Sequence, residues 1–118
     1  MIKSILDWTV IIFIKEYTLF LYLKLDFGEN FITSLSSNMF GDTLRVNDLN
    51  LDHNYIERIG ERSFASVEPR RLYLGKNRIN YIDDEAFTGA ERNLELIDLD
   101  GNQLNNVSHA FSKLKRLR

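Results

Sequence analysis

Three stretches decide the fold: LNLDHNYIERI (residues 49–59), LYLGKNRINYI (72–82) and IDLDGNQLNNV (97–107). In each, an asparagine is preceded by apolar residues three and five positions back and followed by apolar residues two and five positions on. These asparagines are Asn54, Asn77 and Asn102, and the same template fits around Asn30. Their spacing of 23 to 25 residues is typical of solenoid repeats, and such self-similarity outweighs local propensity.

The leucine-like positions predict a shared core, because a repeat of this length cannot bury its apolar face alone. Leu49 and Leu51 alternate with Asp48, Asn50 and Asp52, which predicts a strand with the leucines inward and the polar residues outward. Successive strands of this kind form a parallel sheet. The asparagine follows the strand, where its amide can satisfy backbone groups of the turn, so the four asparagines should form a ladder. A phenylalanine nine or ten residues later should fill the opposite side; these are Phe64, Phe87 and Phe111.

Together these residues resemble the leucine-rich repeat family, with its pattern LxxLxLxxNxLxxLxxxxFxxLxx, over about residues 25–117. The phenylalanine and the repeat length are similar to the typical extracellular subclass, and among its members to arthropod chaoptin-like leucine-rich repeat proteins. The resemblance implies an α/β solenoid. Its form is a curved arc with a parallel sheet on the concave face and loops or short helical turns on the convex face.

Residues 1–24 do not fit the repeat. They are rich in Ile, Phe, Leu and Tyr, but their charge-free stretches are only seven residues long, against the 18 or more that a membrane span needs. Three interpretations stay open: a cap over the first repeat, a poor signal sequence, or an extraneous segment. The predicted organisation is therefore an apolar segment, 1–24, and a domain of about four repeats, 25–118, truncated at its C-terminal end.

Composition excludes several classes of function. The chain has 118 residues and a formal net charge of −2, which argues against nucleic acid as an electrostatic partner. It contains no cysteine, which excludes disulfides, thiol nucleophiles and cysteine metal sites. Extracellular members of the resembled family commonly carry cysteine-rich caps, so this is a departure from the family.

The polar residues do not form a catalytic pattern. His53 and His109 lie in different repeats at non-equivalent positions, with no nucleophile at a matching register. The run Asp98–Asn102 is superficially similar to a calcium loop, but its glycine comes too early and no glutamate closes it. We therefore expect no enzyme activity, no cofactor, no metal and no small-molecule substrate.

The outward face of the predicted sheet is the candidate binding surface, since function in solenoids usually lies on such a face. Tyr73 lies near its middle as an amphipathic anchor, and the face as a whole is moderately acidic. A purely structural interpretation also holds, in which Arg71 neutralises Asp48 on the adjacent strand. The predicted partner-binding residues are Asp48, Asn50, Asp52, Arg71, Tyr73, Asp98 and Asp100.

These residues predict a non-catalytic recognition module for a protein ligand or co-receptor. The alternatives are a spacer or scaffold segment of a larger repeat array and a non-catalytic subunit of an enzyme complex. Asn106-Val107-Ser108 is an N-glycosylation sequon, which favours an extracellular or cell-surface location over a cytoplasmic one. Any membrane anchor is expected only outside this chain.

Overall fold

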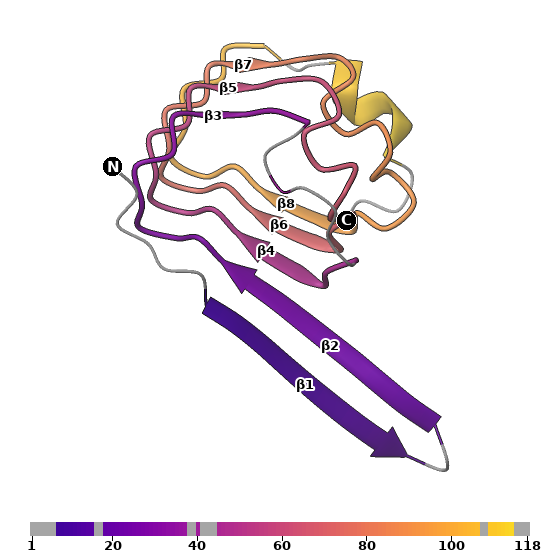
Figure 1. The fold of residues 1–118 in the computed structure, drawn as a ribbon. Helices are drawn as coiled ribbons and strands as arrows, with labels where there is room; N and C mark the ends of the chain where they lie inside the picture. The colour runs from indigo at the N-terminus through magenta and orange to yellow at the C-terminus, as the bar shows by residue number, and fades with distance from the viewer. Residues whose placement is uncertain (1–6, 16–17, 38–39, 41–44, 107–108, 115–118) are drawn as a thin grey trace.

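The fold is a stack of parallel β-strands, one from each repeat (Figure 1). The computed structural model describes residues 7–15, 18–37, 40, 45–106 and 109–114, with 7–15 and 18–23 described by backbone only. The main sheet has the order β1-β2-β4-β6-β8, and β2, β4, β6 and β8 run parallel. Its strands are β1 (Asp7–Lys15), β2 (Thr18–Asp26), β4 (Asp48–Asn50), β6 (Arg71–Tyr73) and β8 (Leu96–Asp98). The predicted parallel sheet is confirmed.

Side chains alternate along these strands as the sequence pattern predicts. Leu49 and Leu72, at the centres of β4 and β6, are fully buried, whereas Asp48 and Asn50 beside Leu49 are partly exposed. Full burial of a leucine stabilises a fold by about 1.5–3 kcal/mol relative to exposure. The repeated leucine-like positions therefore form one continuous core along the stack.

The asparagines form the predicted ladder. Asn54 Nδ2 donates to the Leu51 carbonyl in its own repeat and to the Phe27 carbonyl in the preceding one, each at 3.1 Å. Asn54 Oδ1 accepts the Ile32 N–H at 3.1 Å. Equivalent contacts surround Asn77 and Asn102. Each amide thus joins its own turn to the turn before it.

The predicted phenylalanine row is also confirmed. The Phe64 and Phe87 rings stack at a centroid distance of 5.8 Å and an interplanar angle of 12°, and Phe87 meets Phe111 at 5.5 Å and 44°. Phe64 and Phe87 are buried, and Phe111 is partly buried against the same core. The row therefore joins successive repeats on the side of the core that follows the short strands β5 and β7 in the chain.

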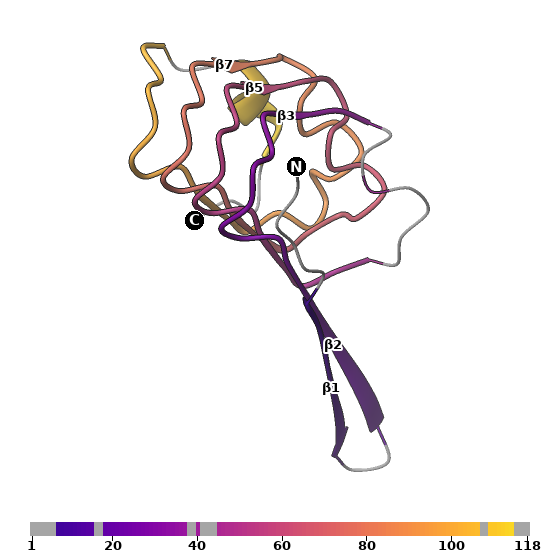
Figure 2. The same cartoon turned by 60° about the vertical axis from the view of Figure 1, so that its left-hand side comes forward.

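A second, three-stranded sheet lies on the side opposite β4, β6 and β8 (Figures 1 and 2). Its strands are β3 (Ser34–Leu35), β5 (Arg58–Ile59) and β7 (Tyr81–Ile82), all parallel. The sequence pattern predicted only loops or short helical turns there. Turns do occupy residues 61–67 and 84–93, and the 3-10 helix η1 spans His109–Lys113. The two-residue strands were missed because they are too short to show alternation.

The N-terminal strands form an antiparallel hairpin that projects from the solenoid (Figures 1 and 2). The predicted boundary between residues 24 and 25 lies inside β2, whose Lys24–Asp26 segment pairs with β4. The first residues of β1 pair with the other edge of that segment, from Asp7 with Asp26 to Thr9 with Lys24. Residues 1–6, the predicted core position Val107 and residues 115–118 lie outside the described residues.

Candidate functional site

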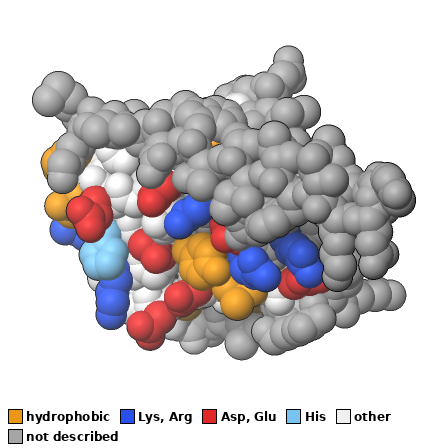
Figure 3. Space-filling model, turned by 90° about the horizontal axis from the view of Figure 1, so that it is seen from below, with side chains coloured by type: hydrophobic (Ala, Val, Ile, Leu, Met, Phe, Trp, Pro, Cys, Tyr) orange, Lys and Arg blue, Asp and Glu red, His pale blue; other side chains and the backbone are white. Residues whose placement is uncertain are grey.

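The outward face of the main sheet is organised in columns that run across the strands. The first column is Lys24, Asp48, Arg71 and Leu96, and the second is Asp26, Asn50, Tyr73 and Asp98. Strand pairing brings together the predicted partner-binding residues of different repeats, because equivalent positions lie about 4.8 Å apart in neighbouring strands. In Figure 3 this face carries red and blue side chains around hydrophobic ones.

An ion pair joins two residues of the first column, Asp48 and Arg71. Arg71 Nη1 lies 3.3 Å from Asp48 Oδ1, and the Asp48 side chain is only 14% exposed. The neutralisation of Asp48 by Arg71 is therefore confirmed. Opposite charges facing each other across strands stabilise a sheet modestly, by roughly 0.2–1 kcal/mol. The pair fixes the guanidinium beside Tyr73 on the same strand.

Hydrogen bonds fix the second column at its first two positions. Asn50 Nδ2 donates to Asp26 Oδ1 at 2.9 Å, and Asn50 Oδ1 accepts the Asp52 N–H at 2.9 Å. Asp26 Oδ1 also accepts the Gly28 N–H. Asn50 is thus held in place by its neighbours.

Tyr73 lies half-buried in the middle of the face. Burial raises the pKa of its hydroxyl above the ordinary value of 10.0, and the charge of Asp48 acts in the same direction. The phenol is therefore neutral at physiological pH, with carboxylates of several strands around it. This arrangement suits a side chain that makes apolar contact through its ring and donates a hydrogen bond from its hydroxyl.

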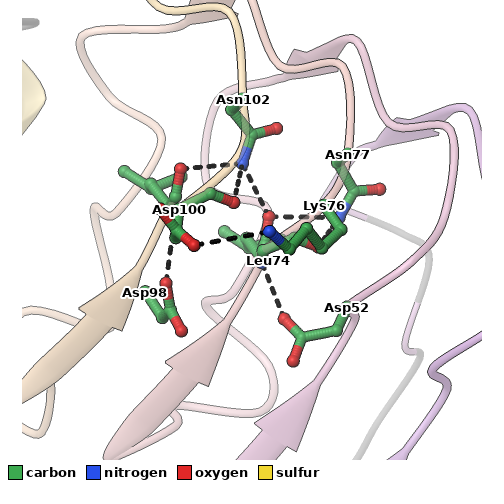
Figure 4. A network of polar contacts seen from close by, with 9 residues as sticks. Asp52, Leu74, Lys76, Asn77, Asp98, Asp100 and Asn102 are labelled. Atoms are coloured by element: carbon green, nitrogen blue, oxygen red, sulfur yellow. Dashed lines mark hydrogen bonds and ion pairs between the residues drawn. The ribbon is translucent and has the colours of Figure 1, made fainter.

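The ends of the strands carry a network of polar contacts (Figure 4). Asp52 Oδ1 accepts the Gly75 N–H at 2.6 Å, and Asp98 Oδ1 accepts the Asp100 N–H at 2.9 Å. Lys76 Nζ lies 3.6 Å from Asp100 Oδ2, although both side chains are more than half exposed. Sequence reasoning did not assign Lys76 to this face. Its position directly before the ladder asparagine Asn77 could have indicated that it lies at the end of the strand face.

Desolvation by burial raises the pKa of the Asp52 carboxyl above 3.8, and the charges of Asp98 and Asp26 add to this effect. The Gly75 N–H and His53 oppose it. Because the folded pKa is raised, ionisation of Asp52 opposes folding. The stability that its neutral form provides is fully present below pH 3.8 and is lost as the pH rises through the folded pKa.

We expect Asp52→Asn to remove the loss of stability that ionisation of Asp52 causes, while it keeps an oxygen that can accept the Gly75 N–H. The variant should match the native protein in thermal unfolding at pH 3 and unfold at a higher temperature at pH 7. Circular dichroism melts across that range measure the difference. A variant that is less stable than the native protein at pH 7 would contradict the prediction.

Asn106 is exposed and contributes to a hollow of about 270 Å³ that Tyr81 and His109 also line. It does not lie with the sheet-face residues. The rest of its sequon, Val107 and Ser108, lies outside the described residues. The side chain is thus accessible at the fourth position after the ladder asparagine Asn102.

Among the described residues, no group of three or more His, Cys, Asp or Glu side chains is placed to hold a metal ion. In the same part of the chain, no helix is long and apolar enough to cross a membrane. The two histidines lie in different elements: His53 follows β4 in a turn with a positive φ of 57°, and His109 begins η1.

Parallel strands from an LxL pattern, an asparagine ladder and a row of stacked phenylalanines define a leucine-rich repeat solenoid. Residues 70–118 match the protein-family model described as leucine rich repeat. This match covers about two fifths of the chain, and leucine-rich repeat domains generally mediate protein–protein interactions.

The chain is similar to proteins from vertebrates and from a nematode. Leucine-rich repeat-containing protein 3B of Danio rerio is 38% identical over 69 residues, which cover 57% of this chain and 27% of that protein. The Homo sapiens protein of the same name is 39% identical over the same coverage. P-granule-associated novel protein 1 of Caenorhabditis elegans is 34% identical over 58 residues, 48% of this chain and 10% of that protein. The chain thus spans about a quarter of the length of the 3B relatives.

Proposed function

We propose that this chain is a non-catalytic recognition module that binds a protein partner on the outward face of its main sheet. The observation that carries the proposal is the position of Tyr73, half-buried between Asn50 and Asp98 of the neighbouring strands, with the charge of Asp48 also acting on it. Tyrosine is enriched among residues that dominate binding energy at interfaces. Five aspartates on the face favour a basic partner, namely Asp26, Asp48, Asp52, Asp98 and Asp100.

The binding residues in this proposal are Asp48, Asn50, Asp52, Arg71, Tyr73, Asp98 and Asp100. The partly buried Asp48–Arg71 pair positions the surface, whereas Asp100, with a side chain 79% exposed, steers approach. Exposed charges act mainly on association rate and on salt dependence. The partner is a protein ligand or co-receptor rather than a nucleic acid, in keeping with the chain's negative net charge.

We infer an extracellular or cell-surface location and membership of the extracellular subclass, with a similarity to chaoptin-like proteins. The exposure of Asn106 supports glycosylation at that residue. For residues 1–24 we favour the cap, because β1 pairs with the outer edge of β2 and removes unpaired groups there. Residues 25–118 then form the repeat domain.

A spacer segment of a larger repeat array is the second candidate. It is supported by the regular stacking of β4, β6 and β8, because repeats that stack in one register can extend an array. A subunit of an enzyme complex would use the same face. The spacer role predicts that Tyr73 can be replaced without loss of a direct partner.

The experiment is affinity capture from an extract of the source organism with immobilised native protein, followed by a binding assay with each purified captured protein. We expect Tyr73→Ala to weaken binding about tenfold or more, since anchors of this kind contribute upwards of about 1.4 kcal/mol. Asp98→Asn should slow association at low salt and have less effect at high salt. Glu61→Gln, an exposed change in the turn 61–67, is the matched control. Equal binding by Tyr73→Ala and the native protein would favour the spacer.

A further inference from the structure

We propose that the chain carries a second protein-binding surface, which takes an acidic and apolar segment of a partner. Its residues are Phe31, Tyr55, Arg58, Arg78 and Tyr81, and we call it the aromatic–arginine surface. It lies on the part of each repeat that runs from the ladder asparagine into the second sheet, away from the outward face of the main sheet. The proposal does not depend on what binds the main sheet.

Two columns of equivalent repeat positions build this surface. The position after the ladder asparagine is Phe31, Tyr55 and Arg78 in successive repeats. The fourth position after it is Ser34, Arg58 and Tyr81, which the pairing of β3, β5 and β7 places side by side. Within a repeat the two positions are three residues apart, so their backbones are at most about 10–11 Å apart. The columns therefore form one surface.

The side chains in these columns are stacked rather than scattered. The Phe31 and Tyr55 rings stack at 5.9 Å and 10°, and the Arg78 guanidinium lies 4.8 Å from the centroid of the Tyr55 ring. In the second column the Arg58 guanidinium lies 4.4 Å from the Tyr81 centroid. Each stack restrains its side chains before any partner arrives, which lowers the entropy lost on binding.

The surface is unusually exposed for its composition. Four large hydrophobic side chains are exposed among the described residues. Three of them belong to this surface: Phe31 (50%), Tyr55 (39%) and Tyr81 (41%). Single exposed apolar residues need no explanation, but gathered aromatic residues together with arginine are the composition enriched at protein interfaces. Burial against a partner is the function that this composition fits.

The arginines determine the chemistry of the partner. Arg45, Arg70 and Arg71 each pair with a carboxylate, whereas within the described part of the chain neither Arg58 nor Arg78 has a carboxylate within ion-pair distance. A guanidinium stacked on a ring keeps its in-plane N–H groups free for a bidentate contact with a carboxylate. Partner aspartate or glutamate side chains fit these groups.

A protein segment fits better than a polyanion such as RNA. Glu57 precedes Arg58 directly and Asp83 follows Tyr81 closely, and Glu57 is exposed. With the net charge of −2, these carboxylates disfavour a ligand that carries a charge at every unit. A peptide with separate carboxylates and apolar side chains between them avoids this repulsion and meets both arginines.

The second sheet lies opposite the strands β4, β6 and β8, as both ribbon views show (Figures 1 and 2). A partner on the aromatic–arginine surface therefore leaves the face around Tyr73 accessible. The chain can hold a basic partner and an acidic partner at the same time.

The test uses fluorescent peptides of four Gly-Glu-Phe units and the matching uncharged Gly-Gln-Phe peptide, titrated with the full chain in an anisotropy assay. We expect the glutamate peptide to bind at least about tenfold more tightly than the glutamine peptide. Arg58→Gln/Arg78→Gln should remove this preference, and Tyr55→Leu/Tyr81→Leu should weaken binding while keeping apolar bulk. Tyr73→Ala should leave this binding unchanged, which separates the result from the function of the main sheet.

Equal affinity for the two peptides, or a glutamate-peptide affinity unaffected by the double arginine variant, would overturn the proposal. A single-stranded RNA 12-mer is assayed in parallel. Tighter binding of the RNA than of the glutamate peptide, lost in the same arginine variant, would assign the surface to nucleic acid instead. Unfolding curves of each variant, expected to match the native protein for the arginine changes, confirm that the fold is retained.

Discussion

Asn77→Ala is expected to lower the free energy of unfolding by about 3 kcal/mol. Asn77 is buried in the middle of the ladder, where its Oδ1 accepts the Ile56 N–H at 3.1 Å and its Nδ2 donates to the Leu51 carbonyl at 3.0 Å and the Leu74 carbonyl at 3.1 Å. Alanine leaves the Ile56 N–H buried without that acceptor, and an unsatisfied buried group costs about 1–3 kcal/mol. The two lost amide bonds add about 0.5–1.5 kcal/mol each. Urea unfolding followed by circular dichroism measures the effect.

Position in the ladder provides the controls for this experiment. Asn30 Oδ1 is buried and has no hydrogen-bond partner among the described residues. Asn30→Ala therefore leaves no backbone N–H without its acceptor. It should cost about 1 kcal/mol, clearly less than Asn77→Ala. Asn80→Ala changes an exposed side chain and should lie within about 0.5 kcal/mol of the native protein. Equal losses at Asn30 and Asn77 would show that the ladder bonds between repeats contribute nothing.

Phe87→Ala is expected to lower the free energy of unfolding by about 3–5 kcal/mol. The ring is 2% exposed and lies between Phe64 and Phe111, at centroid distances of 5.8 and 5.5 Å. Truncation removes the transfer free energy of the ring and leaves a cavity that joins two repeats. The substitution therefore destabilises both neighbouring repeats. The same urea titration measures the change in the free energy of unfolding.

Aromatic residues elsewhere in the chain give matched comparisons for Phe87→Ala. Phe111 lies at the end of the row and is only partly buried, so Phe111→Ala should cost less than half as much. Phe31 is half exposed, and Phe31→Ala should cost less than about 1 kcal/mol. A loss at Phe31 as large as that at Phe87 would mean that the aromatic–arginine surface serves stability, not binding.

The repeat positions could be predicted because each is tied to one backbone geometry. Leu49 and Leu51 were expected inside and are fully buried, and the strands pair in the register that the asparagine spacing implies. The ion pair between Arg71 and Asp48 followed from the same register. Equivalent positions in stacked repeats become neighbours, so a period in the sequence specifies a contact in space.

The second sheet and its surface could not be predicted in this way. β3, β5 and β7 are two residues long, so they show no alternation, and Tyr55, Arg58, Arg78 and Tyr81 do not recur as one residue type. The hairpin of β1 and β2 has no counterpart in the repeat, and its pairing joins residues 7–15 to residues 18–26 through contacts that the repeat template does not contain.

The sequence by itself determined the class of fold, the core and the ladder, because burial of apolar side chains and satisfaction of turn hydrogen bonds act on every repeat at the same positions. Only the tertiary structure decided how the side chains of the aromatic–arginine surface stack on one another. The stacking of Arg78 on Tyr55 and of Arg58 on Tyr81, and the contact of Asp52 with Gly75, join residues more than 20 positions apart. Such contacts depend on the rise and twist between successive repeats, and these follow from packing of the whole stack rather than from the residues of one unit.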